Sequence, residues 1–447
     1  MDRKGKQLIL LELNEVNFDV VAYYAHADRC RFPALASLLD EAQVRTTSEE
    51  KYENLEPWIQ WPSVHLCQPF AEHGIFRLGD VVGTKGEQLF ERLEKAGFKV
   101  GAISAMNAEN RLQSPAYFVP DPWTKTPSDG TWWSCALTQA ISQAVNDNAE
   151  AKVTLKSLLQ LGLCFLRFAR LKNYRVYFGL LFASVSKPWC KALILDLLLH
   201  DVHWNLFNSG KPDFSVIFFN AGAHIQHHYF FNSEAVRRRS SQRNPNWYVK
   251  DEFDPVADML AIYDIIVGEY FKRADVEVLL ATGLSQKPYD RVKFYYRLRS
   301  HAEFLRGLGI EFSAVHPRMT RDFLIEFASE LQAQIAEEKL AEVIVEADGV
   351  ALFGEIDNRG KSLFVTMTYP GEITDATRYA FRGKTAALKS EVSFVAVKNG
   401  MHQAEGFAFF TPEIALYAPS NGVHVLNIGK SIMNYFGLTN VIGADRR

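Results

Sequence analysis

Four short runs of mostly apolar residues constrain the fold of this chain more than any other feature. They are Gln7–Leu13, Lys99–Ser104, Phe214–Asn220 and Val276–Thr282. Such runs are typical of strands buried on both faces, as in parallel sheets that are covered by helices. Helical patterns accompany them at Phe32–Ala42, Gly86–Ala96 and Pro255–Arg273. The sequence therefore predicts an α/β fold with a mostly parallel central sheet flanked by helices.

The chain has 447 residues, which is long enough for one large α/β core with insertions. We predict core segments at 1–130, 205–289 and 396–447, a helical insertion at 131–204, and a mixed α+β cap at 290–395. Within the cap, helices are expected at Arg299–Leu308 and Thr320–Leu340. Strands are expected at Val350–Ile356, Ser362–Tyr369, Val392–Lys398 and, beyond the cap, Phe407–Phe410.

The predicted insertion is both apolar and strongly basic. Between Ala151 and His200 the one acidic residue is Asp196, whereas the basic residues are Lys152, Lys156, Arg167, Arg170, Lys172, Arg175, Lys187 and Lys191. A segment of this kind can lie on an anionic bilayer surface. It can equally be a helical cap that packs on the core with its basic face in water. The sequence leaves both interpretations open, so peripheral membrane contact through 151–200 is one hypothesis.

Composition narrows the class of partner and the compartment. The net charge of -3 gives no overall attraction to nucleic acid, and the basic run has no aromatic platform, so we expect no nucleic-acid partner. Five widely spaced cysteines form no C-x-x-C pair, which favours a reducing compartment. Neither a signal-peptide pattern nor an apolar run of about 18 residues is seen. We therefore expect a cytoplasmic protein, at the inner face of the membrane if the insertion binds it.

Polar residues follow the predicted strands at the edge where open α/β sheets bind their ligands. They lie in Asn14–Asn17, Asn220–His228 and Thr282–Gln286. Three histidines within five positions, His224, His227 and His228, form an uncommon cluster. Histidines can act as general acid and base or bind a metal. The alternatives are that these histidines are structural and that the residues after the first strand cap a turn.

Five segments, taken in order, resemble the type I phosphodiesterase and nucleotide pyrophosphatase branch of the alkaline phosphatase superfamily. They are LLELNEVNFDVV, EPWIQWPSVHLCQPFAEHGIF, FSVIFFNAGAHIQHHYF, VEVLLATGLSQKP and GMHQAEGFAFF. The resemblance covers Leu8 to about Gly130, Asp213–Pro288 and Asn399–Leu438, which is more than half of the chain. It implies an alkaline-phosphatase-like fold with a two-metal phosphoester site.

The resemblance also implies which metal ligands remain. It places Asn14, His227 and His402 at ligand positions, whereas Ala223, Gly283 and Leu284 stand where the family has acidic or imidazole ligands. Two imidazoles and an amide bring almost no negative charge to hold a pair of dications. We therefore expect at most one divalent metal, zinc or manganese.

The nucleophile of the family has no counterpart in this register. Pro57 stands at its position, and Ser63 is the nearest hydroxyl, about one and a half helical turns further on. Ser63 is therefore either the nucleophile or an ordinary helix residue. Arg237, in the run Arg237–Arg239, could hold a phosphate through bidentate hydrogen bonds, or belong to a solvated loop.

These considerations define a predicted site. The predicted catalytic residues are His227, His224, Ser63 and Glu15, the substrate-binding residues Asn17, Trp61, Asn220, His228, Arg237 and Gln286, and the metal ligands Asn14, His227 and His402. The predicted function is that of a divergent phosphoester hydrolase or group transferase. Its substrate would be a phosphorylated small molecule or a glycan-type phosphate. The alternative is an inactive pseudo-phosphatase that serves as a binding or scaffold protein.

Overall fold

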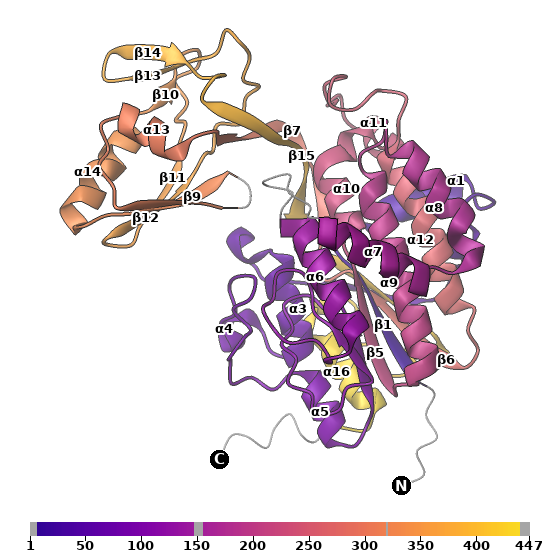
Figure 1. Ribbon diagram of the computed structural model, residues 1–447. Helices are drawn as coiled ribbons and strands as arrows, with labels where there is room; N and C mark the ends of the chain where they lie inside the picture. The colour runs from indigo at the N-terminus through magenta and orange to yellow at the C-terminus, as the bar shows by residue number, and fades with distance from the viewer. Residues whose placement is uncertain (1–6, 147–154, 319–320, 439–447) are drawn as a thin grey trace. The chain divides into compact units, whose positions relative to one another are not determined.

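The computed structural model describes residues 7–146, 155–318 and 321–438, which form two compact units (Figure 1). The larger unit contains the described residues up to Ser241 together with Val249–Pro288 and Gly400 onward. The smaller unit contains Gln242–Tyr248 and Tyr289–Asn399. The larger unit is an α/β fold with a mostly parallel central sheet, which confirms the predicted fold class.

The central sheet has eight strands in the order β17-β2-β16-β6-β1-β5-β3-β4. Their bounds are β1 (Gln7–Leu13), β2 (Ala42–Thr47), β3 (Val100–Ile103), β4 (Tyr117–Val119), β5 (Phe214–Phe219), β6 (Val276–Ala281), β16 (Gly406–Phe410) and β17 (Val423–His424). The four apolar runs of the sequence are β1, β3, β5 and β6, which all pair in parallel. The reversed strand is β16, which is antiparallel to both β2 and β6.

Helices cover both faces of this sheet (Figure 1). On one face lie α3 (Pro57–Leu66), α5 (Leu89–Lys95) and α16 (Leu426–Tyr435). On the other face lie α1 (Phe18–Ala27), α2 (Pro33–Leu38), α9 (Cys190–Gly210), α10 (Ala221–Tyr229) and α12 (Pro255–Phe271). Shorter helices are α4 (Phe70–His73), α11 (Glu234–Arg237) and α15 (Pro412–Ala415), with 3-10 turns η1 (Tyr52–Asn54) and η4 (Phe230–Asn232).

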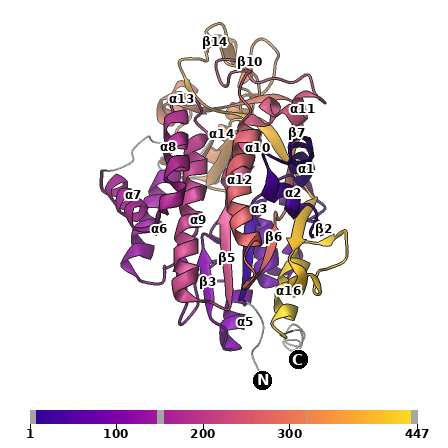
Figure 2. The same cartoon turned by 90° about the vertical axis from the view of Figure 1, so that its right-hand side faces the viewer.

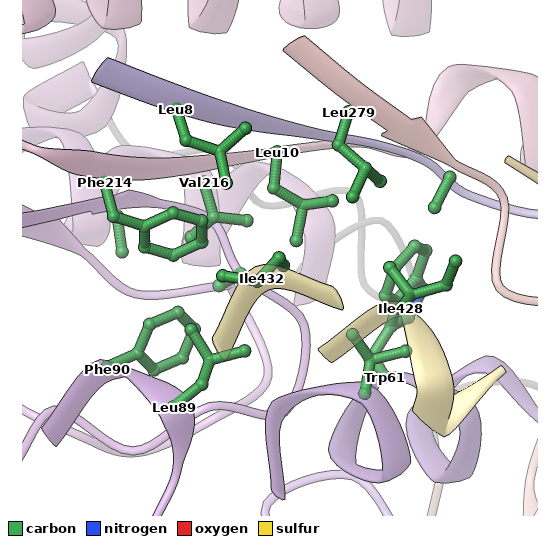
Figure 3. Close-up of a cluster of buried hydrophobic side chains, with 14 of the residues drawn as sticks. Leu8, Leu10, Trp61, Leu89, Phe90, Phe214, Val216, Leu279, Ile428 and Ile432 are labelled. Carbon is green, nitrogen blue, oxygen red and sulfur yellow. The ribbon is translucent and has the colours of Figure 1, made fainter. Parts of the chain in front are cut away.

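The core beneath α3, α5 and α16 shows why the four runs are almost continuously apolar (Figure 3). Side chains from β1, β5 and β6 point toward the three helices and are fully buried, among them Leu8, Leu10, Phe214, Val216 and Leu279. Across from them lie Trp61 of α3, Leu89 and Phe90 of α5, and Ile428 and Ile432 of α16. Because α9 and α12 cover the opposite face, the side chains that point to either face of the central strands must be apolar.

The segment between β4 and β5 is helical, as the sequence predicts. It contains α6 (Trp132–Asn146), α7 (Leu155–Phe168), a 3-10 turn η3 (Leu171–Asn173) and α8 (Tyr174–Ala183) before α9. Helix α7 contacts α6 and α9, and α8 contacts α9. In Figure 2, α6, α7 and α8 lie outside α9 on one side of the sheet.

The smaller unit is built from antiparallel strands and two helices. Its elements are β8 (Ala314–Pro317), β9 (Asp322–Glu326), β10 (Ile344–Val345), β11 (Glu355–Asn358), β12 (Ser362–Thr366), β13 (Arg378–Phe381), β14 (Lys384–Ala387), α13 (His301–Gly307) and α14 (Glu330–Ala341). Two long strands, β7 (Ser285–Leu298) and β15 (Val392–Gln403), pair with each other. Each of them contains residues of both units.

Two predicted helices differ from the structure. Thr320 lies outside the described residues, and Asp322–Glu326 is a strand in which Phe323 and Ile325 are buried. Buried side chains at every second position favour the strand. The helix begins only after Ser329, whose side chain accepts a hydrogen bond from Gln332 N. Likewise, the helix predicted to reach Ala42 ends at Leu38, because Ala42 begins β2.

Candidate functional site

Three side chains that are far apart in the sequence converge at one point of the larger unit. Glu15 Oε2 lies 3.0 Å from His227 Nε2 and 3.0 Å from His402 Nε2. The two Nε2 atoms lie 3.2 Å apart. We call Glu15, His227 and His402 the Glu-His-His cluster.

The topology of the sheet brings these residues together. Glu15 follows β1, and His227 lies in the last turn of α10, which follows the neighbouring strand β5. His402 lies near the end of β15, immediately before β16 enters the same sheet. The cluster therefore occupies the carboxyl edge of the parallel strands, where open α/β sheets bind ligands.

Backbone contacts set the direction of the Glu15 side chain. Glu15 has a φ of 60°, in the left-handed region that few residues other than glycine adopt. Its N–H donates to the Thr282 carbonyl at 3.0 Å, and Gln226 Nε2 donates to its carbonyl oxygen at 2.8 Å. These bonds tie the turn after β1 to the ends of β6 and α10. The left-handed turn thus aims the carboxylate at the two imidazoles.

A backbone carbonyl faces the far side of the His227 ring, and a carboxylate faces the far side of the His402 ring. His227 Nδ1 lies 3.1 Å from the Gly400 carbonyl oxygen, which can only accept, so this nitrogen carries a proton. His402 Nδ1 lies 3.4 Å from Glu56 Oε2. In the structure both Nε2 atoms lie within hydrogen-bond distance of Glu15 Oε2. In neutral rings with the proton on Nδ1, the Nε2 lone pairs would be available to a metal in place of these contacts. A histidine that donates one N–H to a carbonyl or carboxylate and presents the other nitrogen is typical of a metal ligand.

The distances within the cluster suit a small divalent cation. Zinc–nitrogen bonds of about 2.0–2.1 Å in a tetrahedron place neighbouring ligand atoms about 3.3–3.4 Å apart. The three separations here are 3.0, 3.0 and 3.2 Å. Two imidazoles and one carboxylate form a mixed nitrogen and oxygen donor set, which zinc and manganese both accept. The side chains of the cluster therefore fit one such ion.

The carboxylate of Glu15 is almost fully buried and held in its ionised form. Burial alone would raise the pKa of Glu15, but the charges and hydrogen bonds of His402 and His227 hold it well below its usual value. Gln286 Nε2 donates to Oε2 at 2.5 Å, and Asn14 Nδ2 donates to Oε1 at 3.0 Å. Glu15 thus provides the cluster with one buried negative charge.

Asn14 is next to the cluster but faces Glu15. Its Oδ1 accepts from Trp61 Nε1 at 2.9 Å, and its Nδ2 donates to both Glu15 and Asn220 Oδ1. Among the predicted metal ligands, the structure thus brings His227 and His402 together and puts Glu15, rather than Asn14, beside them. Trp61 and Asn220, predicted to bind substrate, hold Asn14 in place.

Two more predicted substrate-binding residues support the backbone of the site. Asn17 caps α1 through Oδ1 and donates from Nδ2 to the Gln286 carbonyl at 2.8 Å. Gln286 donates to Glu15 and to the Ala223 carbonyl. These residues orient the cluster, which is a positioning role.

The remaining predicted residues lie outside the cluster. His224 is exposed on α10, and its ring lies 4.7 Å from that of His228 at an interplanar angle of 54°. The ring of His228 lies 6.4 Å from that of His227. Arg237 ends α11 and donates to the Phe253 carbonyl at 3.2 Å.

Ser63 has a structural role in α3. Its hydroxyl is buried, donates to the Ile59 carbonyl at 3.1 Å and lies 3.0 Å from His73 Nε2. Because Ile75 N donates to His73 Nδ1, the neutral ring carries its proton on Nε2 and donates to Ser63. Burial lowers the pKa of His73 to about 4. His73 therefore cannot take the proton of Ser63 as a general base would.

Two residues of the site escaped the sequence analysis. Glu56 directly precedes Pro57, the first residue of α3, and its carboxylate contacts His402 while 29% of the side chain stays exposed. The sequence signal for Glu56 was an acidic residue directly before a proline that starts a helix. Gly400 lets its carbonyl approach His227, because a Cβ there would lie 2.1 Å from Gln286 Oε1.

No protein-family model matches the sequence, and no curated protein matches it. Solved structures do match. One is phosphonoacetate hydrolase from Sinorhizobium meliloti 1021 with phosphonoacetate, at 11% identity and a TM-score of 0.43, covering 96% of both chains. Another is murine ectonucleotide pyrophosphatase/phosphodiesterase 5, at 9% identity and a TM-score of 0.40, covering 97% of this chain and 96% of the other.

A third similar structure is a mutant of TAB5 alkaline phosphatase with bound Mg, at 10% identity and a TM-score of 0.40, covering 97% of this chain and 99% of the other. At such low sequence identities, a similar structure does not show that two proteins share an activity.

Proposed function

We propose that this protein is a phosphoester hydrolase that works with a single divalent metal. The observation that supports the proposal most directly is the convergence of Glu15 Oε2, His227 Nε2 and His402 Nε2 at 3.0–3.2 Å. These three side chains would hold the ion, zinc or manganese. When bound, the metal supplies Lewis acidity toward a phosphoryl oxygen.

The surroundings of the cluster suit an anionic substrate. Helix α3 begins at Pro57, and the preceding Glu56 contacts His402, so the positive end of this helix lies next to the cluster. The dipole of a helix favours a phosphate group near its N-terminus. The bound metal would offset the negative charges of Glu15 and Glu56, which also lie there. The motif order of the sequence points to the same class of substrate, a phosphorylated small molecule or a glycan-type phosphate.

The chain's own residues favour direct attack by water. Pro57 has no nucleophilic atom, and the Ser63 hydroxyl is engaged in the helix interior. We propose that the partly exposed Glu56 carboxylate takes one proton from the attacking water. The new P–O bond to water forms as the P–O bond to the leaving group breaks, and Glu56 then gives the proton it took from water to the leaving alkoxide, which restores its carboxylate. A group transferase would use an acceptor hydroxyl in place of water.

The alternative is a metal-binding protein without turnover. Its support is the same proline at the position that the resemblance gives to the nucleophile. In that case the cluster would bind a phosphorylated ligand, and the protein would act as a binding or scaffold protein.

Metal analysis and turnover assays on the full chain separate these functions. We expect close to one zinc or manganese per chain by elemental analysis, lost in His227→Ala and in His402→Ala. His26→Ala, an exposed histidine at the end of α1, is the matched control and should keep its metal. We expect the metal-loaded protein to hydrolyse bis(p-nitrophenyl) phosphate or p-nitrophenyl phosphate. Metal without turnover supports the binding protein, and the absence of both contradicts the hydrolase.

A further inference from the structure

Helix α7 presents an apolar stripe to solvent. Leu159, Gly162, Leu163 and Leu166 follow the i, i+3, i+4, i+7 spacing of one helical face, and all four are exposed. The opposite side of the helix carries the buried Cys164 and Phe168. A helix on the surface of a soluble domain normally places its polar side outward. Helix α7 has apolar residues on both sides.

Helix α8 repeats this arrangement. Phe178, Leu181 and Phe182 have the same spacing, which Val185 continues two residues beyond the end of the helix. Phe182 and Val185 are 77% and 88% exposed. Tyr177 is buried against the rest of the unit. Between the two helices, Leu171 of η3 is 81% exposed. The apolar face thus consists of Leu159, Leu163, Leu166, Leu171, Phe178, Leu181, Phe182 and Val185.

A hollow on this face is lined almost entirely by apolar atoms. It is formed by Leu159, Gly162, Leu163, Phe165 and Leu166 of α7. Single exposed apolar residues are ordinary on protein surfaces, but several neighbours along one helical face mark an interaction site. In Figure 2, α7 lies at the outer edge of the helical layer, beyond α9.

Each of the two helices with an apolar stripe also carries an exposed arginine. Arg167 follows Leu166 on α7, and Arg175 lies on α8 one turn before Phe178. The segment from Leu155 to Lys191 contains no acidic residue at all. Arg170, by contrast, pairs with the buried Asp201. Exposed positive charge without a neighbouring acidic residue in sequence therefore accompanies both apolar stripes.

We infer that the apolar face of α7, η3 and α8 binds the surface of a bilayer that contains anionic phospholipids. Apolar side chains on one face and arginine or lysine at its border are the features of helices that lie in the membrane interface. A second copy of this chain on the same face would bring the exposed arginines of both copies together, which disfavours self-association. Within the described part of the chain, each helix is too short or too polar to cross a membrane.

Vesicle co-sedimentation with the full chain tests the inference. We expect the protein to sediment with phosphatidylcholine vesicles that contain phosphatidylglycerol, and much less with phosphatidylcholine alone. The double variant Leu166→Ser and Phe182→Ser should bind at least about tenfold more weakly. The double variant Arg167→Gln and Arg175→Gln should bind anionic vesicles about fivefold more weakly for each charge removed. Vesicle binding by the unchanged protein should weaken as the salt concentration rises.

Matched variants keep the test specific. Leu331→Ser with Leu416→Ser removes two apolar side chains that are 65% and 82% exposed elsewhere, and should bind vesicles as the unchanged protein does. Lys361→Gln with Lys384→Gln is the corresponding charge control. Circular dichroism should show every variant folded, because all these side chains are exposed.

Three results would overturn the inference. The first is that the unchanged protein fails to sediment with anionic vesicles. The second is that the Leu166 and Phe182 variant binds them equally well. The third comes from light scattering: a dimer that this variant converts to a monomer, without vesicle binding by the unchanged protein, assigns the face to a second copy of the chain.

Discussion

At the scale of single residues, the site depends on an acidic side chain one position away from the expected ligand. The resemblance places Asn14 at a ligand position, but the structure uses Asn14 to hold Glu15, whose carboxylate meets His227 and His402. The two histidines could be found from the sequence because they follow recognisable segments. The role of Glu15 depends on a left-handed backbone at φ 60°, which the residue type does not favour and the sequence does not reveal.

Replacing Glu15 with glutamine tests its role as a ligand. The substitution keeps the shape and the donors around it but removes the buried negative charge. We expect the affinity for zinc to fall by more than about 100-fold, since even supporting residues of metal sites contribute 10- to 100-fold. Calorimetric titration measures the loss. Glu50→Gln, at an exposed position, should leave the affinity unchanged, and equal affinities for both variants would remove Glu15 from the site.

Glu56 offers a separate test of the proposed chemistry. Glu56→Gln keeps the size of the side chain and a carbonyl oxygen beside His402 Nδ1, so metal binding should change little. If the carboxylate takes the proton of water, kcat should fall by about 10²- to 10⁴-fold. Steady-state kinetics of the metal-loaded variant, with elemental analysis of the same sample, separates the two effects. An unchanged kcat would assign the proton transfer to another group.

At the scale of elements, a buried ion-pair network anchors helices α7 and α8. Arg170 lies between α7 and η3, and its guanidinium contacts Asp201 of α9 and Glu269 of α12, each at 2.6 Å. Asp201 is fully buried and also accepts from Asn173 and Tyr177. The network therefore holds the start of α8 and the end of α7 against the main helical layer.

Removing Arg170 should destabilise the protein strongly. Arg170→Met leaves Asp201 buried without its cation, which costs about 3–5 kcal/mol of unfolding free energy. Lys172→Met is the matched control, because Lys172 pairs with the same Glu269 but is 54% exposed, so its loss should cost less than about 1 kcal/mol. Urea denaturation followed by fluorescence measures both. Equal small losses would show that the network is not an anchor.

Glu269 should make stability depend on pH. Burial tends to raise the pKa of Glu269, but His200, Lys172 and Arg170 outweigh it and lower the pKa to about 2. A depressed pKa contributes stability above the unfolded value of about 4.5, and this contribution declines as pH falls toward 2. Relative to Glu269→Gln, the unchanged protein should lose about 2 kcal/mol of unfolding free energy between pH 6 and pH 3. If the difference in unfolding free energy between the two proteins did not change with pH, the lowered pKa of Glu269 would be contradicted.

Element prediction from the sequence was accurate where burial alone decides the conformation. The four apolar runs became β1, β3, β5 and β6, because strands buried on both faces have an unambiguous pattern. The prediction was wrong at Asp322–Glu326. The alternation of buried and less buried side chains covers only this short strand, and the longer charged helix after it dominates the sequence pattern. The outward apolar stripes of α7 and α8 were also hidden, because composition does not tell which face a helix buries.

At the scale of the whole molecule, the two units have separate hydrophobic cores. One core includes Leu8, Trp61 and Ile432, and the other includes Leu363 and Leu340. All members of the second core belong to the smaller unit. Independent cores allow each unit to unfold in its own transition, which a single two-state analysis would not describe.

Calorimetry with and without metal should separate these transitions. Saturating zinc at 100 times its dissociation constant stabilises the unit that binds it by about 2.7 kcal/mol. We expect the midpoint temperature of the larger unit's transition to rise by several degrees, while that of the smaller unit does not change. Leu363→Ala should lower the smaller unit's transition, at a cost of about 2–5 kcal/mol, without changing the metal response. A metal shift of both transitions would mean that the units unfold together.

The pairing of β7 with β15 has a consequence for the site. Gln286 lies near the start of β7 and His402 near the end of β15, and the two strands pair with each other. One ligand of the Glu-His-His cluster and one support of Glu15 therefore sit on the same two-stranded ribbon. A proline placed in either strand near this end would remove a ladder hydrogen bond and so disturb both residues together.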